Sequence, residues 1–176
     1  MNGTKKDQNL FKRLKELGIS TTTAEHAPLH TVEESQALRG ELKGAHIKNL
    51  FLRDKKKNMW LLTVEENNNV DLKGLRKIIG AKGNLSFGNT DLLMDKMGVT
   101  PGSVSPFCVI NDTEGEVIMI LDKSLLEAAV INAHPLRNDR TTAISSNDLM
   151  TFLKSENHDP ILIDFSKPLN IDEGQT

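Results

Sequence analysis

Residues 47–64 read IKNLFLRDKKKNMWLLTV, two apolar runs on either side of a charged turn. Each run has the length of a β-strand and contains leucine together with isoleucine, valine or aromatic residues. Lysines and an asparagine fill the four positions 55–58 between them, as expected of a turn exposed to water. We therefore predict a β-hairpin with strands over residues 47–52 and 59–64.

The sequence on both sides of this hairpin predicts several helices, from the spacing of apolar residues and from end signals. They cover a segment from Leu10 to Leu17 closed by Gly18, residues 72–79 capped by Asp71 and closed by Gly80, residues 90–97 closed by Gly98, and residues 146–154. Thr31 with Glu34 forms a capping box that opens a short helix to Arg39, and Ser124 with Glu127 caps a helical turn.

Further strands are predicted over residues 107–110, 117–121, 130–132 and 160–165, with loops over 99–106 and 134–142. Strands and helices mix without regular alternation. This pattern favours an α+β fold with a mixed, mostly antiparallel sheet flanked by helices. We expect one domain over residues 1–176, with its core over 7–165, a frayed end over 1–6 and a loose tail over 166–176.

Composition excludes several classes of protein. The chain has 176 residues, a net charge of −2 and one cysteine, Cys108, so neither an intramolecular disulfide nor a zinc site built on thiolates is expected. Cys108 lies in an apolar run and is predicted to be a small core residue. No apolar run approaches the roughly 20 residues of a membrane span, and the polar N-terminus has no signal core. We expect a soluble cytoplasmic domain.

Two features near the hairpin and the 99–106 loop carry candidate chemistry. Lys48, with Asn49 beside it, is positioned to hold a phosphate or polarise a carbonyl, although a solvated strand lysine is the commoner case. Gly102 allows close backbone approach in a loop stiffened by prolines, which suits the stabilisation of an oxyanion; a simple turn before a strand is the alternative. Ser103 or Ser105 is a conceivable nucleophile, but no Gly-x-Ser-x-Gly elbow surrounds them.

The segment HPLRNDRTT (134–142) packs a histidine, an amide, two arginines and two hydroxyls into nine residues. Loops of this density often bind ligands, and a solvated turn is the alternative. A zinc site from His26, His30 and His46 is disfavoured, because Pro28 breaks any helix that would align the first two.

Basic residues gather in two stretches, one at the hairpin and one further along the chain. Lys48, Arg53 and Lys55–Lys57 lie within ten residues, and Lys73, Arg76, Lys77 and Lys82 follow. Such groups can neutralise several phosphates, while three lysines at a hairpin tip are also typical of a solvated turn.

Taken in order, these segments resemble the YbaK/aminoacyl-tRNA deacylase family, in particular its free-standing prolyl-tRNA-editing branch, which is similar to the editing domain inserted in bacterial prolyl-tRNA synthetase. The likeness covers about residues 7–165. It rests on EHAP (25–28) with TVEE (31–34), KNLFLRDKK (48–56), VDLK (70–73), LSF (85–87), GVTPGSVSPF (98–107), ND (111–112), HPLRN (134–138), TT (141–142), and DL (148–149) to FL (152–153).

The resemblance implies hydrolysis of a wrong amino acid from charged tRNA. The sequence itself offers no obvious metal site and no convincing catalytic triad, so neither a metal nor a cofactor is expected. The family's lysine falls on Lys48, its Gly-x-x-x-Pro loop on Gly102 to Pro106, and its specificity histidine on His134. We expect Lys48, Gly102, Ser103 and His134 in the catalytic centre, acting by placing water and stabilising the oxyanion. The residues expected to bind substrate are Thr31, Asn49, Val104, Pro106 and Asn138.

The implied substrate is the acceptor end of tRNA(Pro) charged with alanine, with cysteine or serine esters left open, and prolyl-tRNA synthetase is a possible partner. Two rival functions remain at this point. One is a non-catalytic tRNA-binding or synthetase-associated module, favoured by the basic clusters. The other is a serine hydrolase of small esters, which requires a hydrogen bond from His134 to Ser103 or Ser105. Oligomeric state is not predicted.

Overall fold

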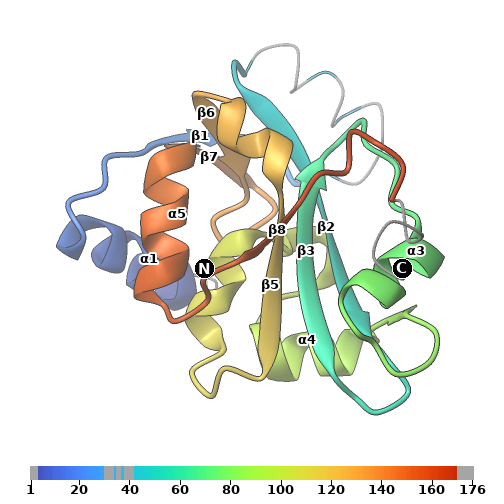
Figure 1. Ribbon diagram of the computed structural model, residues 1–176. Helices are drawn as coiled ribbons and strands as arrows, with labels where there is room; N and C mark the ends of the chain where they lie inside the picture. Colours follow the sequence, from blue (N-terminus) through green and yellow to red (C-terminus); the bar gives the residue numbers. More distant parts are fainter. Residues whose placement is uncertain (1–3, 30–33, 35–36, 38–41, 170–176) are drawn as a thin grey trace.

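The computed structural model describes residues 4–29, 34, 37 and 42–169, and its strands form one mixed sheet (Figure 1). The strand order is β1-β7-β6-β2-β3-β5-β8, and β4 pairs with β2 beside this path. The strands are β1 (Thr22–Glu25), β2 (Ala45–Arg53), β3 (Met59–Glu65), β4 (Ser86–Phe87), β5 (Val117–Asp122), β6 (Val130–Ala133), β7 (Arg140–Ser145) and β8 (Ile161–Ile163).

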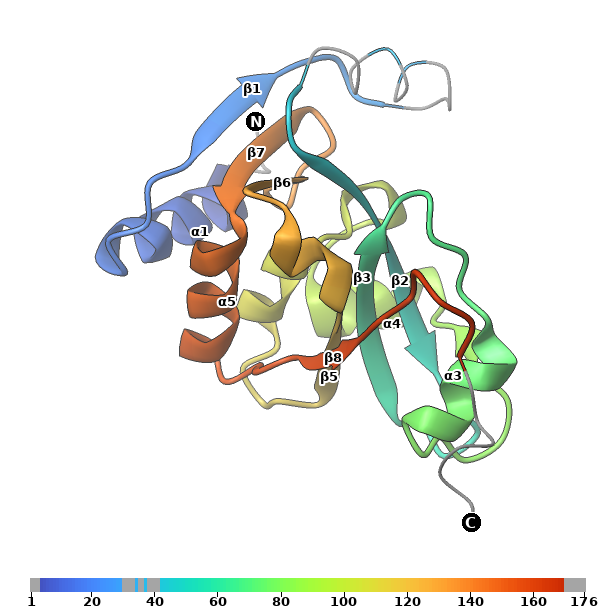
Figure 2. The same ribbon diagram turned by 45° about the horizontal axis from the view of Figure 1, so that its top comes forward.

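The helices of the described chain surround this sheet. They are α1 (Thr4–Glu16), α3 (Leu72–Ile78), α4 (Thr90–Met97) and α5 (Ser146–Ser155), with the 3-10 helices η1 (Pro101–Ser103), η2 (Pro106–Asn111) and η3 (Lys123–Glu127). In Figures 1 and 2, α1 and α5 lie side by side at one end of the sheet and α3 lies at the other. Among these helices, none is long and apolar enough to cross a membrane.

The predicted hairpin is confirmed and its first strand, β2, lies inside the sheet. β2 pairs antiparallel with β3, with Lys48 opposite Val64 and Asn49 opposite Thr63. At its start β2 also pairs in parallel with β6, and at its end it pairs antiparallel with β4. The sheet as a whole is mixed, as expected, because β3–β5 and β5–β8 are parallel whereas β1–β7 and β6–β7 are antiparallel.

Alternation along β2 and β3 divides the buried residues into two cores. Phe51 and Leu61 face the larger core, which α1, α4, η2 and α5 complete. Leu52 and Leu62 face the smaller core beneath α3. Successive side chains of a strand point to opposite faces, so these apolar runs are buried on both sides.

The four predicted helices and most of the predicted strands are confirmed within a few residues. Asp71 caps α3 by accepting a hydrogen bond from the Lys73 N–H, and Gly98 ends α4 with a φ of 71° that suits glycine. Cys108 is fully buried in the larger core, as predicted.

The predicted strand over residues 107–110 is wrong, because this segment forms the 3-10 helix η2. Pro106 stands in its first turn, and the Ser105 hydroxyl caps it by accepting a hydrogen bond from the Phe107 N–H at 3.2 Å. The run is apolar because η2 is buried in the larger core, not because it pairs in a sheet. Short buried helices and buried strands have the same apolar composition, so periodicity did not separate them.

Three other expectations are corrected. Residues 140–142, predicted as the end of a polar loop, belong to strand β7, which lies between β1 and β6. Asp122 rather than Ser124 caps η3, and its carboxylate accepts hydrogen bonds from the Ser124 N–H and hydroxyl. Helix α1 begins at Thr4, inside the segment expected to fray. Leu169 packs against the smaller core, and residues 170–176 lie outside the described chain, so the loose tail over 166–176 stays a prediction.

The hairpin turn is held by a buried carboxylate, Asp54, which is 2% exposed. It accepts hydrogen bonds from the backbone N–H groups of Lys56, Asn58 and Lys82 and from the Asn58 side chain, at 2.8–2.9 Å. Burial opposes ionisation of Asp54, but these four hydrogen bonds outweigh it and hold its pKa below the ordinary 3.8.

Replacing Asp54 with alanine should lower the free energy of unfolding by about 2–3 kcal/mol, because the backbone donors lose their acceptor. Urea denaturation at neutral pH measures this, with the exposed Asp159→Ala as control. Because the pKa of Asp54 is lowered in the folded protein, its stabilisation is present above the unfolded pKa and is lost as pH falls through the folded one. Equal stability of the two variants would contradict this role.

Candidate active site

The loop over residues 100–106 is compact and largely buried. Pro101 opens η1, and the Ser103 N–H donates a hydrogen bond to the Thr100 carbonyl at 3.0 Å. Ser103, Val104 and Pro106 are buried, and Pro106 begins η2. Proline at two positions and the 3-10 turns restrict the backbone, so the loop is suited to present its peptide groups in a fixed direction.

Asn49 ties this loop to the central hairpin. Its side-chain amide donates a hydrogen bond to the Val104 carbonyl at 3.1 Å. The fully buried Thr63 hydroxyl donates to the Asn49 side-chain oxygen at 2.6 Å, across the β2–β3 pair. Both ends of the Asn49 amide are thus engaged, and the position of the loop is coupled to the register of the hairpin.

The loop meets the 134–142 segment at Gly102. A Cβ atom added at Gly102 would lie 3.3 Å from the Asn138 side-chain nitrogen, tighter than an ordinary van der Waals contact. The Asn138 amide in turn donates a hydrogen bond to the Leu29 carbonyl at 2.8 Å. Gly102 therefore permits a close approach between two segments separated by more than thirty residues.

His134 is held in one tautomer by the segment that contains it. Its Nδ1–H donates a hydrogen bond to the Arg140 carbonyl at 2.8 Å, since a carbonyl oxygen only accepts. The neutral ring therefore keeps its lone pair on Nε2. Burial lowers the pKa of His134 below 6.5; the hydrogen bond to Arg140 opposes this shift, and the nearby His26 adds to it.

His26 lies beside His134, with ring centroids 6.2 Å apart. Its Nδ1–H donates to the Ala27 carbonyl, and its Nε2 lies 2.9 Å from the Thr141 hydroxyl. Sequence reasoning considered His26 only as a zinc ligand. The signal that could have identified it is its place in the EHAP stretch, one of the segments on which the family resemblance rests.

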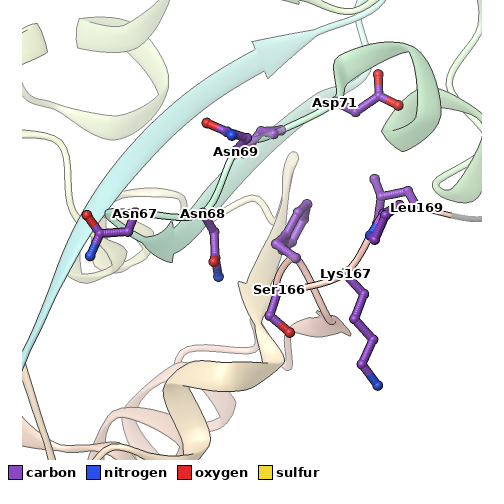
Figure 3. Close-up of a pocket in the computed structure, with 10 residues that line it drawn as sticks. Asn67, Asn68, Asn69, Asp71, Ser166, Lys167 and Leu169 are labelled. Atoms are coloured by element: carbon purple, nitrogen blue, oxygen red, sulfur yellow. The ribbon is translucent and has the colours of Figure 1, made fainter.

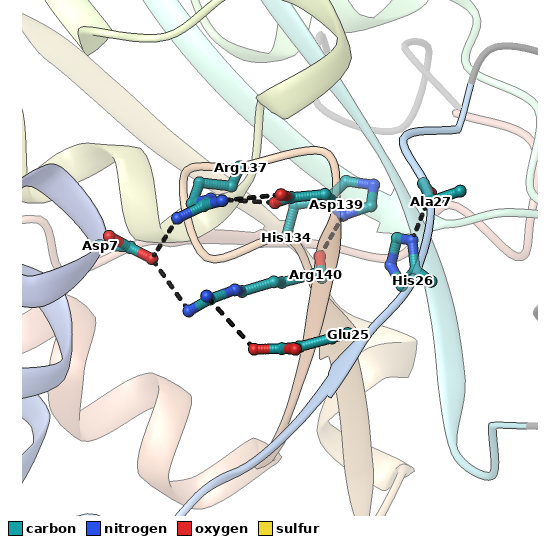
Figure 4. Close-up of polar contacts among 8 residues, drawn as sticks. All are labelled: Asp7, Glu25, His26, Ala27, His134, Arg137, Asp139 and Arg140. Carbon is teal, nitrogen blue, oxygen red and sulfur yellow. Dashed lines mark hydrogen bonds and ion pairs between the residues drawn. The ribbon is translucent and has the colours of Figure 1, made fainter. Parts of the chain in front are cut away.

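Two arginines and a buried carboxylate hold the 137–140 segment against α1 (Figure 4). Arg137 and Arg140 each lie within 3.4 Å of Asp7 Oδ2, and Asp7 is 2% exposed. Arg137 also binds both oxygens of Asp139, which lowers the pKa of that carboxyl below 3.8. Because Arg140 supplies the carbonyl that orients His134, the ion-pair cluster sets the backbone that positions this histidine.

Lys48 and Thr31 stand apart from this arrangement. Asn49 points toward the 100–106 loop, and alternation along β2 places Lys48 on the opposite face with Leu50 and Leu52, which belong to the smaller core. In the described part of the chain, the Lys48 ammonium makes neither a hydrogen bond nor an ion pair. Thr31 and His30 lie outside the described residues.

The alternative of a serine hydrolase requires a histidine that can activate a serine nucleophile, and the described part of the chain does not provide this pair. Among the residues that the structure describes, no hydrogen bond joins His134 to Ser103 or Ser105. The Ser105 hydroxyl caps η2 and is fully buried. Within the same residues, no group of three His, Cys, Asp or Glu side chains is placed to hold a metal ion.

A separate pocket of about 520 Å³ lies between residues 67–71 and 165–169 (Figure 3). Its lining includes Asn67, Asn68, Asn69 and Lys167, and it contains none of the residues predicted for the site. Part of its polar lining has partners within the protein, because the Asn67 amide donates to Glu65 and the Asn68 amide donates to Asp122.

The model of the aminoacyl-tRNA editing domain matches residues 26–152, a range that contains the 100–106 loop, His26 and His134. The chain belongs to the aminoacyl-tRNA editing domain family. It is therefore an enzyme of the aminoacyl-tRNA deacylase class, as the resemblance implied. The family assignment therefore favours an enzyme over the alternative function, a non-catalytic tRNA-binding or synthetase-associated module.

Two curated relatives are similar over nearly their whole length. Prolyl-tRNA synthetase associated domain-containing protein 1 of Bos taurus is 39% identical over 95% of this chain and 99% of its own. The prolyl-tRNA editing protein ProX of Acetoanaerobium sticklandii is 37% identical over 84% of this chain and 90% of its own. A crystal structure of a candidate trans-editing enzyme for prolyl tRNA synthetase has a TM-score of 0.69 at 18% identity, covering 90% of this chain and 95% of its own, which confirms the fold.

The environment of His134 predicts its titration. Its pKa should lie below 6.5, and His26→Gln should raise it, because the neighbouring imidazole no longer disfavours the charged ring. NMR titration of the histidine side chains measures both values. Since the folded pKa is depressed, the free energy of unfolding should decrease as pH falls from 6.5 toward that pKa, and His134→Gln should remove this contribution. A pKa at or above 6.5 would contradict the assigned burial.

Proposed function

We propose that this protein is a trans-editing hydrolase that removes alanine from mischarged tRNA(Pro). The observation that carries the proposal is the junction of the 100–106 loop with the 134–142 segment, where Gly102 approaches Asn138 and His134 lies nearby in the chain. The names of the two relatives, one associated with prolyl-tRNA synthetase and one a prolyl-tRNA editing protein, support tRNA(Pro) as the substrate and the synthetase as a partner.

The reaction is hydrolysis of the ester between an amino acid and the terminal ribose of tRNA. Water attacks the ester carbonyl, a tetrahedral oxyanion forms, and the ribose oxygen leaves with a proton. Backbone groups of the loop around Gly102 would stabilise the oxyanion and hold the water. Asn49 keeps that loop in place through Val104. Positioning and fixed dipoles of this kind supply large rate effects without a covalent intermediate.

The other predicted residues divide between the two ends of the substrate. His134, neutral and with its Nε2 lone pair available, would border the amino-acid pocket beside Asn138 and Pro106. Lys48, whose side chain lies on the opposite face of β2 from Asn49, would hold the terminal adenosine or its phosphate rather than the ester. Thr31 would contribute to substrate binding. The neighbouring ribose hydroxyl of the substrate would assist proton transfer to the leaving oxygen.

Selectivity for alanine over proline would come from size. A small pocket rejects a bulkier side chain by steric overlap, which discriminates more sharply than the roughly 1–3 kcal/mol available from a missing methylene. Cysteine and serine are close to alanine in size, so their esters are the substrates against which the proposal is tested.

Single-turnover deacylation of Ala-, Cys-, Ser- and Pro-tRNA(Pro) and of Ala-tRNA(Ala) measures this selectivity. We expect rapid loss of alanine from tRNA(Pro) only. Lys48→Ala and His134→Ala should lower the rate by about 10²-fold or more, while Ser103→Ala should stay within about threefold, because no nucleophilic serine is used. Lys154→Ala, an exposed change on α5, is the control.

Two results would overturn this scheme. Faster hydrolysis of the cysteine or serine ester would reassign the substrate. An inactive Ser103→Ala variant, together with an acyl-enzyme trapped on the wild type, would replace direct attack by water with covalent catalysis.

Gly102→Ala tests the close approach directly. The added methyl group would displace the Asn138 amide by a few tenths of an ångström, and we expect deacylation to slow by about tenfold with little change in stability. In an Asn138→Ala background the same substitution should cost much less, because the displaced group is absent. Additive effects in the double variant would show that Gly102 acts independently of Asn138.

A further inference from the structure

Two basic stretches of the sequence meet at the end of the sheet that carries the β2–β3 turn. The Lys55 N–H donates a hydrogen bond to the Lys82 carbonyl at 3.1 Å, and a Cβ added at Gly83 would lie 3.2 Å from Lys55 Cβ. The loop after α3 is therefore packed against the hairpin turn. We name the cationic side chains gathered here the basic end: Lys55, Lys56, Lys57, Arg76, Lys77 and Lys82.

The basic end is rigid at its base. Asp54 binds backbone N–H groups on both sides of the junction, those of Lys56 and Asn58 in the turn and that of Lys82 in the loop. The Arg76 guanidinium donates to the Asn84 side chain at 2.8 Å, and the Ala81 N–H donates to the Arg76 carbonyl. These contacts connect the last turn of α3 to the same loop. The backbone segments that carry the cationic side chains are therefore held next to one another without a ligand.

The charge of this region is not neutralised by the protein. Residues 53–82 contain eight Lys and Arg against four Asp and Glu, in a chain whose net charge is −2. One of the four acids, Asp54, is buried and turned toward backbone donors. In the described chain, the five lysines of the basic end make no ion pair, and all five are exposed. Like charges held together without counter-ions favour a polyanionic partner.

The basic end follows directly after the strand that carries Asn49, β2. Asn49, which holds the 100–106 loop, and Lys55 are six residues apart along β2 and its turn, or about 20 Å at the rise of an extended strand. Figure 1 shows the β2–β3 turn and α3 together at one end of the sheet, with α1 and α5 at the other. A base-paired stem whose charged 3′ end enters the site can extend over this distance.

We propose that the basic end binds the phosphate backbone of the tRNA body while the aminoacyl end occupies the active site. The inference rests on the proposed function and adds to it a second contact surface. Flexible lysine ammonium groups suit phosphates, and base-paired RNA is recognised mainly through its backbone and shape. The surface therefore contributes affinity for tRNA, whereas discrimination between amino acids remains at Gly102 and His134.

The test compares two substrates that share the same reacting group. One is full-length Ala-tRNA(Pro), and the other is a short single-stranded RNA with the same 3′ nucleotides, also esterified with alanine. The variant neutralises the turn with Lys55→Gln, Lys56→Gln and Lys57→Gln. The matched control neutralises three exposed lysines at the other end of the molecule, with Lys12→Gln, Lys15→Gln and Lys154→Gln.

We expect the turn variant to show a kcat/KM about tenfold lower on full-length tRNA, through KM, and to retain the wild-type value on the short RNA. A plot of log kcat/KM against the logarithm of the salt concentration should have a shallower slope for the turn variant than for the wild type. The slope should decrease by about 0.7–0.9 for each phosphate that the protein no longer neutralises. Unchanged kcat/KM on full-length tRNA would overturn the proposal. An equal decrease of kcat/KM in the control variant would also overturn the proposal, because the loss of any three lysines would then weaken the attraction between protein and tRNA.

Binding of uncharged tRNA(Pro), measured by fluorescence anisotropy, separates this proposal from the proposed function. If the wild type hydrolyses neither ester, the proposed substrate is wrong, yet weaker tRNA binding by the turn variant alone would still support the basic end. If all three proteins bind tRNA equally, the basic end does not contact it, and a protein partner becomes the remaining occupant. Urea denaturation of the variants establishes that they are folded.

Discussion

Strand β2 is the element on which the rest of the structure depends. It pairs with β3, β4 and β6, and its alternating side chains face two different cores. A shift of one residue in its register would exchange Phe51 with Leu52 and turn Asn49 away from the 100–106 loop. The same alternation that buries apolar surface on both faces therefore also directs the Asn49 amide that holds the 100–106 loop.

The candidate site is built from segments that are distant in sequence and joined by polar contacts. Asn49 reaches Val104, Asn138 reaches Leu29, and His26 contacts Thr141. Asp7 on α1 adds a buried charge that two arginines of the 137–140 segment share. Removing Asp7 would leave those arginines without their buried partner, so α1 supports the site although none of its residues is proposed to touch the substrate.

The two proposals assign different tasks to the two ends of the sheet. The end with β6 and β7 holds His134 and the junction with Gly102, to which the proposed function assigns the choice of amino acid. The end with the β2–β3 turn presents cations that bind without regard to the amino acid. Such a division lets affinity for tRNA and selectivity for the ester be altered independently, which a single compact site does not allow.

Local pattern was sufficient for the β2–β3 hairpin, for the helices with strong end signals and for the buried Cys108, because each depends on neighbours within a few residues. It failed for η2 and β7. The first is an apolar run whose burial imitates a strand, and the second is a polar run that becomes a strand only because β1 and β6 lie on either side of it. The candidate residues of the loop and of the 134–142 segment were found from their types and from the family resemblance, yet their mutual contacts were not. The partnership of His26 with His134, the placement of Asn138 against Gly102 and the union of two basic stretches at one end all require chain segments to meet in space. Composition and residue spacing do not reveal such long-range contacts, because these contacts are set by sheet register and core packing rather than by any local preference.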